Sequence, residues 1–185
     1  KLLAGTGLRA ARFIVTGGKA KLDANLRAYN HAARGIGWFV LRDLDRDAGC
    51  APELVPELLP SPMPTMCARL AVRSLEAWIL SDAESLATYL RVSATLIPSA
   101  PDELEDPKRA LVNLARRSRS SAIRRGFVPR EGASVRVGPE YASRLVEFGV
   151  SSWSWQRARA RSPSLARCLR ALRRLRSVLD DLDRR

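Results

Sequence analysis

Two aspartates that follow an apolar run are the residues of this chain best placed to do chemistry. Residues 38–41 are apolar, typical of a buried strand, and Asp43 and Asp45 follow them at alternate positions. If the backbone stays extended, both carboxylates point to the same side, because strand side chains repeat every two residues. Mg²⁺ (or Mn²⁺) takes oxygen ligands and needs only one or two protein carboxylates. The spacing predicts a divalent-metal site, and a solvated aspartate-rich loop is the alternative.

A third acid, Glu76, begins a helix just after the next predicted strand, residues 66–72. If the two strands are neighbours, Glu76 lies at the same sheet edge as Asp43 and Asp45. Three carboxylates there would suit one or two Mg²⁺ ions that act on a phosphodiester. An acid in a first helical turn also complements the helix dipole, by ~0.3–1 kcal/mol. A purely structural role for Glu76 therefore stays open.

Basic residues near these acids are candidates for phosphate binding. Arg69 and Arg73 share one side of their strand by parity, and they either reach phosphate oxygens or neutralise the acids. Lys108, in the turn that opens a later helix, is a further candidate. The chain has a single histidine, His31, so no Ser/His/Asp or Cys/His arrangement can be assembled. Without such an arrangement, nucleophilic hydrolase chemistry of the usual kind is excluded.

The charge balance favours a polyanionic partner. Lys and Arg number 32 against 19 Asp and Glu, which gives a net charge of +13. Nucleic acid is the first candidate, and an acidic protein or an anionic membrane comes next. An arginine-rich proteome would produce the same surplus without any ligand. The widely spaced Cys50, Cys67 and Cys168 indicate reduced thiols in a cytoplasmic protein, and no apolar stretch approaches the ~18 residues of a membrane span.

The first half of the chain has the element order of an α/β domain. Strands are predicted at residues 12–16, 38–41 and 66–72, and helices at 21–34, 53–58, 74–80 and 83–90. Strands that alternate with helices imply a parallel sheet with right-handed crossovers. We expect residues 1–96 to form this domain, with a central, mostly parallel sheet flanked by helices.

The second half is helical and basic. Asp106 and Pro107 are an N-cap and a first-turn proline, and they predict a helix to about residue 117. Further helices are expected at 120–125, 140–148 and 164–183. The last has a leucine stripe, with arginines around the remaining surface, and is amphipathic with a positive outer face. Residues 97–185 are thus predicted to form a basic helical extension.

Two longer stretches carry a resemblance to a known family. They are residues 40–46 (VLRDLDR) and 69–82 (RLAVRSLEAWILSD), and shorter matches occur at 106–108, 137–141 and 162–165. Together they resemble the Toprim-like proteins of bacterial defence and mobile-element loci, which are often encoded beside an ABC-type ATPase. The resemblance implies a compact α/β fold with a parallel sheet that binds Mg²⁺.

The resemblance also implies site residues. Asp43 and Asp45 match the Asp-x-Asp pair of the Toprim fold, and Glu76 belongs to the Glu-Ala-Trp motif of the similar proteins. The upstream glutamate of that fold has no match, because no Glu occurs before Glu53. The chain opens on Lys1 in mid-pattern, and we expect the missing glutamate either before Lys1 or not at all.

The first functional hypothesis is a Mg²⁺-dependent Toprim-type nuclease that cleaves DNA or RNA in phage defence. Asp43, Asp45 and Glu76 would hold the metal, while Arg73, Arg69 and Lys108 would contact the phosphate backbone. The alternative is a non-catalytic nucleic-acid-binding or adaptor subunit of an ATPase-containing defence complex, which the missing glutamate favours. A third hypothesis is a docking module that binds a protein partner through the helix at 164–183.

Overall fold

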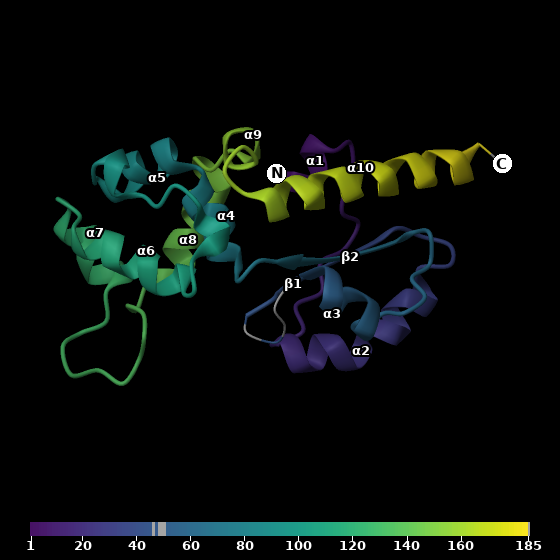
Figure 1. The fold of residues 1–185 in the computed structure, drawn as a ribbon, viewed down its shortest axis with the longest axis horizontal. Helices are drawn as coiled ribbons and strands as arrows, with labels where there is room; N and C mark the ends of the chain where they lie inside the picture. The colour runs from purple at the N-terminus through teal and green to yellow at the C-terminus, as the bar shows by residue number, and fades with distance from the viewer. Residues whose placement is uncertain (46, 48–50, 185) are drawn as a thin grey trace. The chain divides into compact units, whose positions relative to one another are not determined.

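The computed structural model describes residues 1–45, 47 and 51–184 (Figure 1). Its contacts divide the chain into two compact units. Unit 1 is Lys1–Val72 with Ser164–Arg185, and unit 2 is Arg73–Pro163. This division by contacts differs from the division at residues 96 and 97, which stays a prediction. Cys50 lies outside the described residues.

Unit 1 contains a parallel pair of strands with helices on both faces. Its elements are α1 (Leu2–Gly5), α2 (Lys19–Ala32), β1 (Trp38–Asp43), α3 (Ala51–Leu58), β2 (Met66–Ala71) and α10 (Pro163–Asp183). The two strands run parallel, with Trp38 opposite Met66 and Asp43 opposite Ala71. The two strands are therefore neighbours, and the parallel arrangement that the element order predicts is confirmed for this pair. Both strands end at the same sheet edge.

Alternation along the strands sends side chains to two separate helical layers (Figure 1). Val40 and Met66 pack with Leu26 of α2 on one face. On the other face lies α10, the long helix drawn on the opposite side of the strands from α2 and α3. It approaches closely at Gly37, where a β-carbon would come within 2.7 Å of the Leu179 side chain. A glycine at that position therefore lets the end of α10 lie against the chain.

The predicted strand at residues 12–16 is absent, and this corrects the expected sheet. These residues are described but form neither strand nor helix, and Phe13 and Val15 are 81% and 93% exposed. Their β-branched and aromatic side chains favour a strand only where a neighbouring strand and a buried face are available. Within the described residues the sheet has two strands. The fold is mixed α/β with a small parallel sheet rather than a large central one.

Unit 2 is helical, as the sequence predicts for most of it. Its elements are α4 (Leu75–Ser81), α5 (Ala83–Leu90), η1 (Ala94–Leu96), η2 (Pro101–Glu103), α6 (Pro107–Arg116), α7 (Ser121–Phe127), α8 (Tyr141–Ser151) and α9 (Trp155–Ala158). The predicted cap of α6 is confirmed, because Asp106 Oδ1 accepts a hydrogen bond from the Arg109 N–H at 2.9 Å. Trp78, Phe127 and Phe148 are fully buried and form its largest core side chains.

An ion pair between the buried Asp82 and the half-exposed Arg157 joins α5 to α9 in unit 2. Asp82 is completely buried at the start of α5, and both its oxygens accept hydrogen bonds from Arg157 of α9, at 2.8 and 3.0 Å. The Ser154 N–H also donates to this carboxylate at 2.7 Å. A buried carboxylate needs such partners, because an unpaired charge in the interior is costly.

In the part of the chain that is described, no helix has the length and apolarity needed to span a bilayer.

Candidate functional site

The acidic turn that follows β1 is the candidate site. Asp43 is the last residue of β1, and the Leu44 N–H still bonds to the Ala71 carbonyl at 2.9 Å. Leu44 is fully buried, and its side chain anchors the end of β1 in the core. Asp45 then adopts a left-handed backbone conformation with φ of 52°, which aspartate tolerates better than most residues. The backbone does not stay extended, so the argument that placed Asp43 and Asp45 on one side by parity does not apply.

Asp45 is brought together with Asp47 instead, around one cation. Lys19 Nζ lies 2.9 Å from Asp45 Oδ2 and 2.8 Å from Asp47 Oδ1. Lys19 is the first residue of α2, in the Gly-Gly-Lys turn that Gly17 and Gly18 form with positive φ angles. Two carboxylates from the turn after β1 thus converge on a single point.

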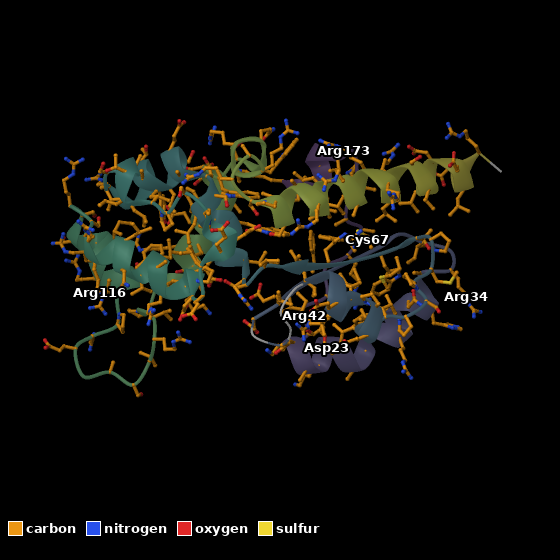
Figure 2. The ribbon with its side chains drawn as sticks, viewed as in Figure 1. Asp23, Arg34, Arg42, Cys67, Arg116 and Arg173 are labelled. Atoms are coloured by element: carbon orange, nitrogen blue, oxygen red, sulfur yellow. The ribbon has the colours of Figure 1, made fainter. Side chains whose placement is uncertain are left out.

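A second cation, Arg42, anchors the same turn from inside. Its side chain is 5% exposed, and its guanidinium binds both oxygens of Asp23, with Nε–Oδ1 and Nη2–Oδ2 each at 2.8 Å. Nη2 also donates to Asp47 Oδ2 at 2.6 Å. Figure 2 labels Arg42 on the sheet and Asp23 on α2. Lys19 and Asp23 lie one helical turn apart, on the same face of α2, and so reach the same strand end.

These ion pairs shift the protonation of the groups that form them. Hydrogen bonding from Lys19 holds the pKa of the Asp47 carboxyl below its ordinary value, and the bond from Arg42 acts in the same direction. The hydrogen bonds to Asp47 and Asp45 raise the pKa of Lys19. The bond to Asp23 raises the pKa of Arg42. In this cluster the side chains of three aspartates pair with those of one lysine and one arginine.

The donor set of this turn fits a hard divalent cation in type and in convergence. Asp45 and Asp47 supply carboxylate oxygens that meet at one point, and Mg²⁺ commonly binds through one or two carboxylates and several waters. That point is held here by the Lys19 ammonium, so a metal would have to displace it. Among the described residues, no group of three or more His, Cys, Asp or Glu side chains is arranged to hold a metal.

Glu76, the third predicted ligand, belongs to unit 2 and has partners there. Its buried carboxylate accepts a hydrogen bond from the Tyr141 hydroxyl at 2.9 Å, and Lys108 Nζ lies 3.6 Å from the same oxygen. The structure therefore brings two sequence-predicted residues, Glu76 and Lys108, together within one unit. The roles of Glu76 in metal binding and of Lys108 in phosphate binding stay predictions.

The two predicted phosphate-binding arginines flank the end of β2. Arg69 is half-buried in β2, where its Nη1 donates to the Ala68 carbonyl at 2.8 Å. Its Nε is buried and has no hydrogen-bond partner among the described residues. Arg73 follows β2, is half-buried, and begins unit 2. Contacts of Arg69 and Arg73 with phosphate stay predictions.

Sequence reasoning did not select Asp47 as a site residue, and it missed the partners of the acidic turn: Lys19 and Asp23 of α2 and Arg42 of β1. Arg42 itself was one signal in the sequence, because an arginine inside an otherwise apolar strand has to find an acid when it is buried.

Comparison of the chain with protein-family models, with curated proteins and with solved structures gave no match.

Proposed function

We propose that this protein is a metal-dependent nuclease that binds DNA or RNA and cleaves phosphodiester bonds at the turn after β1. The observation that carries the proposal is the convergence of Asp45 and Asp47 on one cation position. The resemblance of residues 40–46 and 69–82 to Toprim-like proteins supports the same reading, as does the net charge of +13.

The energetics of Lys19 are compatible with exchange for a metal. The Lys19 side chain is 42% exposed, and ion pairs of exposed side chains contribute little to stability because solvent screens them. A divalent ion brings twice the charge to the same two carboxylates. Lys19 is therefore a weak competitor, able to swing into solvent or toward a phosphate when a metal binds.

In the proposed mechanism, Asp45 and Asp47 would hold Mg²⁺ or Mn²⁺ together with water, and Asp43 and Glu76 stay the further ligands that the sequence predicts. Bound metal would supply a Lewis acid for the phosphate and a more acidic water. Arg42 keeps the turn in position through Asp23 and Asp47. Arg73, Arg69 and Lys108 are proposed to neutralise and orient the phosphate backbone.

The proposed setting is the cytoplasm of a bacterial cell, with the protein acting as an effector of phage defence. An ABC-type ATPase is the proposed partner, which would gate the nuclease. Both statements rest on the resemblance to Toprim-like proteins. They predict that the nuclease is more active when the ATPase is co-purified with it.

Calorimetric titration of Mg²⁺ and Mn²⁺ tests the proposal directly. Wild-type protein should bind metal, and the Asp45→Asn/Asp47→Asn variant should lose binding and cleavage while keeping its affinity for nucleic acid. Glu131→Gln, which removes an exposed acid in unit 2, is the control and should behave as wild type. Cleavage that survives in the double variant would overturn the assignment.

A second candidate function is nucleic-acid binding without cleavage, as an adaptor subunit. The observation that favours it is the neutralisation of the acidic turn by Lys19 and Arg42. Two results would support the adaptor over the nuclease: an affinity for nucleic acid that does not change with Mg²⁺, and no heat of binding when metal is titrated into the protein.

A further inference from the structure

The outer face of α10 carries a row of arginines that the proposed cleavage site does not use. Its members are exposed and lie three residues apart, with a fourth arginine directly after the third: Arg167, Arg170, Arg173 and Arg174. At 3.6 residues per turn they fall within an arc of about 120°, over about 10 Å of helix. Figure 2 labels Arg173 on this helix. We propose that this arginine row binds the sugar-phosphate backbone of the nucleic acid, an inference that rests on the nucleic-acid-binding part of the proposed function.

The opposite face of α10 is already used by the fold. Buried side chains line it: Leu165, Cys168, Leu169, Leu172 and Leu175. A helix that binds a membrane surface needs its apolar face for the lipid, and here that face is covered within unit 1. The arginine row therefore lies on the helix face opposite the buried leucines, and α10 has no free apolar face to insert into a membrane.

The four arginines have no acid to neutralise them within the described chain. No ion pair there involves any of them, whereas their neighbour Arg176 pairs with Asp180 and donates to the Gly7 carbonyl. Like charges three and four residues apart on a helix repel each other. A bound polyanion removes this repulsion, which gives the row a preference for an anionic partner.

The chemistry of the row matches phosphate better than it matches an acidic protein. All four cations are arginine, whose planar fork donates two parallel hydrogen bonds to a phosphate. The side chains that flank the row on this face, Ala166 and Ser177, are small. Protein interfaces depend on large apolar or aromatic anchors in their centres, and this face offers none among these positions.

The salt dependence of nucleic-acid binding tests the proposal. The quadruple variant Arg167→Gln/Arg170→Gln/Arg173→Gln/Arg174→Gln keeps the helix, because glutamine is a good helix former and the positions are exposed. Binding of a short DNA duplex and of a short RNA should weaken by roughly 100-fold or more at low salt. For the duplex, the slope of log K against log[salt] should fall by about 3–4, since each phosphate contact contributes about 0.9.

Two further variants make the experiment specific. The charge-matched control replaces four exposed arginines of unit 2, Arg116, Arg117, Arg125 and Arg130, by glutamine, and should bind nearly as wild type. The corresponding four-lysine variant of the row should keep the salt slope and lose less affinity than the glutamine variant, because charge remains while the fork is lost.

The outcomes separate this inference from the proposed function. If wild type binds nucleic acid and the glutamine variant of the row binds equally well, the row is not the contact surface, while the proposed function stands. If the unit 2 control loses as much affinity as the row variant, diffuse charge is responsible and the inference fails. A wild type that binds no nucleic acid overturns both. If wild type bound polyglutamate or anionic vesicles as tightly as nucleic acid, and this binding also required the row, nucleic acid would be the wrong partner.

Discussion

Arg42 and Asp23 form a two-pronged ion pair that joins β1 to α2. The guanidinium is almost completely buried, and both of its bonds to the carboxylate measure 2.8 Å. Arg42→Met keeps much of the apolar stem and removes the charge, which leaves Asp23 and Asp47 without their inner partner. We expect the free energy of unfolding to fall by about 2–3 kcal/mol, less than for a fully buried pair because Asp23 is partly exposed.

Urea unfolding followed by circular dichroism measures this loss. Arg27→Met, an exposed arginine of the same helix as Asp23, is the matched control and should change stability by less than about 0.5 kcal/mol. Equal stability of Arg42→Met and wild type would mean that the pair does not hold β1 to α2.

Lys19 is expected to compete with the metal. Replacing it by methionine leaves Asp45 and Asp47 with an unfilled cation position, so Mg²⁺ affinity should rise several-fold in calorimetry. Lys21→Met removes an exposed charge two residues away and should leave metal affinity nearly unchanged. A drop in affinity in Lys19→Met would instead assign Lys19 a supporting role in the metal site.

Stability should fall in acid through Asp47. Its pKa in the folded protein lies below the ordinary value of 3.8, first because of the bond from Lys19. A carboxyl with a depressed folded pKa contributes stability above its unfolded pKa, and this contribution is lost as the pH falls through the folded pKa. Unfolding measured from pH 6 down to about pH 2.5 should therefore show a smaller acid loss in Asp47→Asn than in wild type. Parallel pH profiles would refute this role for Asp47.

Thiol chemistry offers a test of the packing of α10. Burial raises the pKa of the Cys168 thiol to about 12, and burial also raises the pKa of Cys67 on β2. In a Cys50→Ser background, a thiol reagent at pH 8 should react slowly with the native protein and rapidly in denaturant, because thiolate is the reactive form. Fast reaction of the native variant would show that α10 does not cover the sheet.

The sequence predicted the parts of the fold that local pattern controls. The paired strands around Val40 and Leu70, the cap at Asp106 and the amphipathic α10 all follow from periodicity and end signals. The strand predicted at residues 12–16 was wrong because strand formation also needs a partner strand, and local composition does not show whether one is available. The pattern of Phe13 to Val15 is that of a strand, yet the neighbour that would bury it is not among the described strands.

The candidate site was predictable only in part. An acidic turn after a buried strand could be read from Asp43 and Asp45 alone. The left-handed conformation at Asp45 could not, because it depends on how Leu44 is anchored in the core. The contact of Lys19 with Asp45 joins residues 26 positions apart. Such a pair depends on where α2 docks on the sheet, and charge pattern does not specify that.

The membership of α10 in unit 1 sets an order for the folding of this chain. Unit 2 is one continuous stretch, whereas unit 1 needs its earliest residues and α10, separated by more than ninety residues, 73–163. During synthesis, unit 2 can therefore fold before unit 1 is complete, because the face of the sheet at Cys67 stays uncovered until α10 emerges and docks. Such long-range closure is slow, and exposed apolar surface promotes aggregation. Until α10 has been made, the nascent chain therefore holds an incomplete unit 1, and docking of α10 is the step that completes this unit.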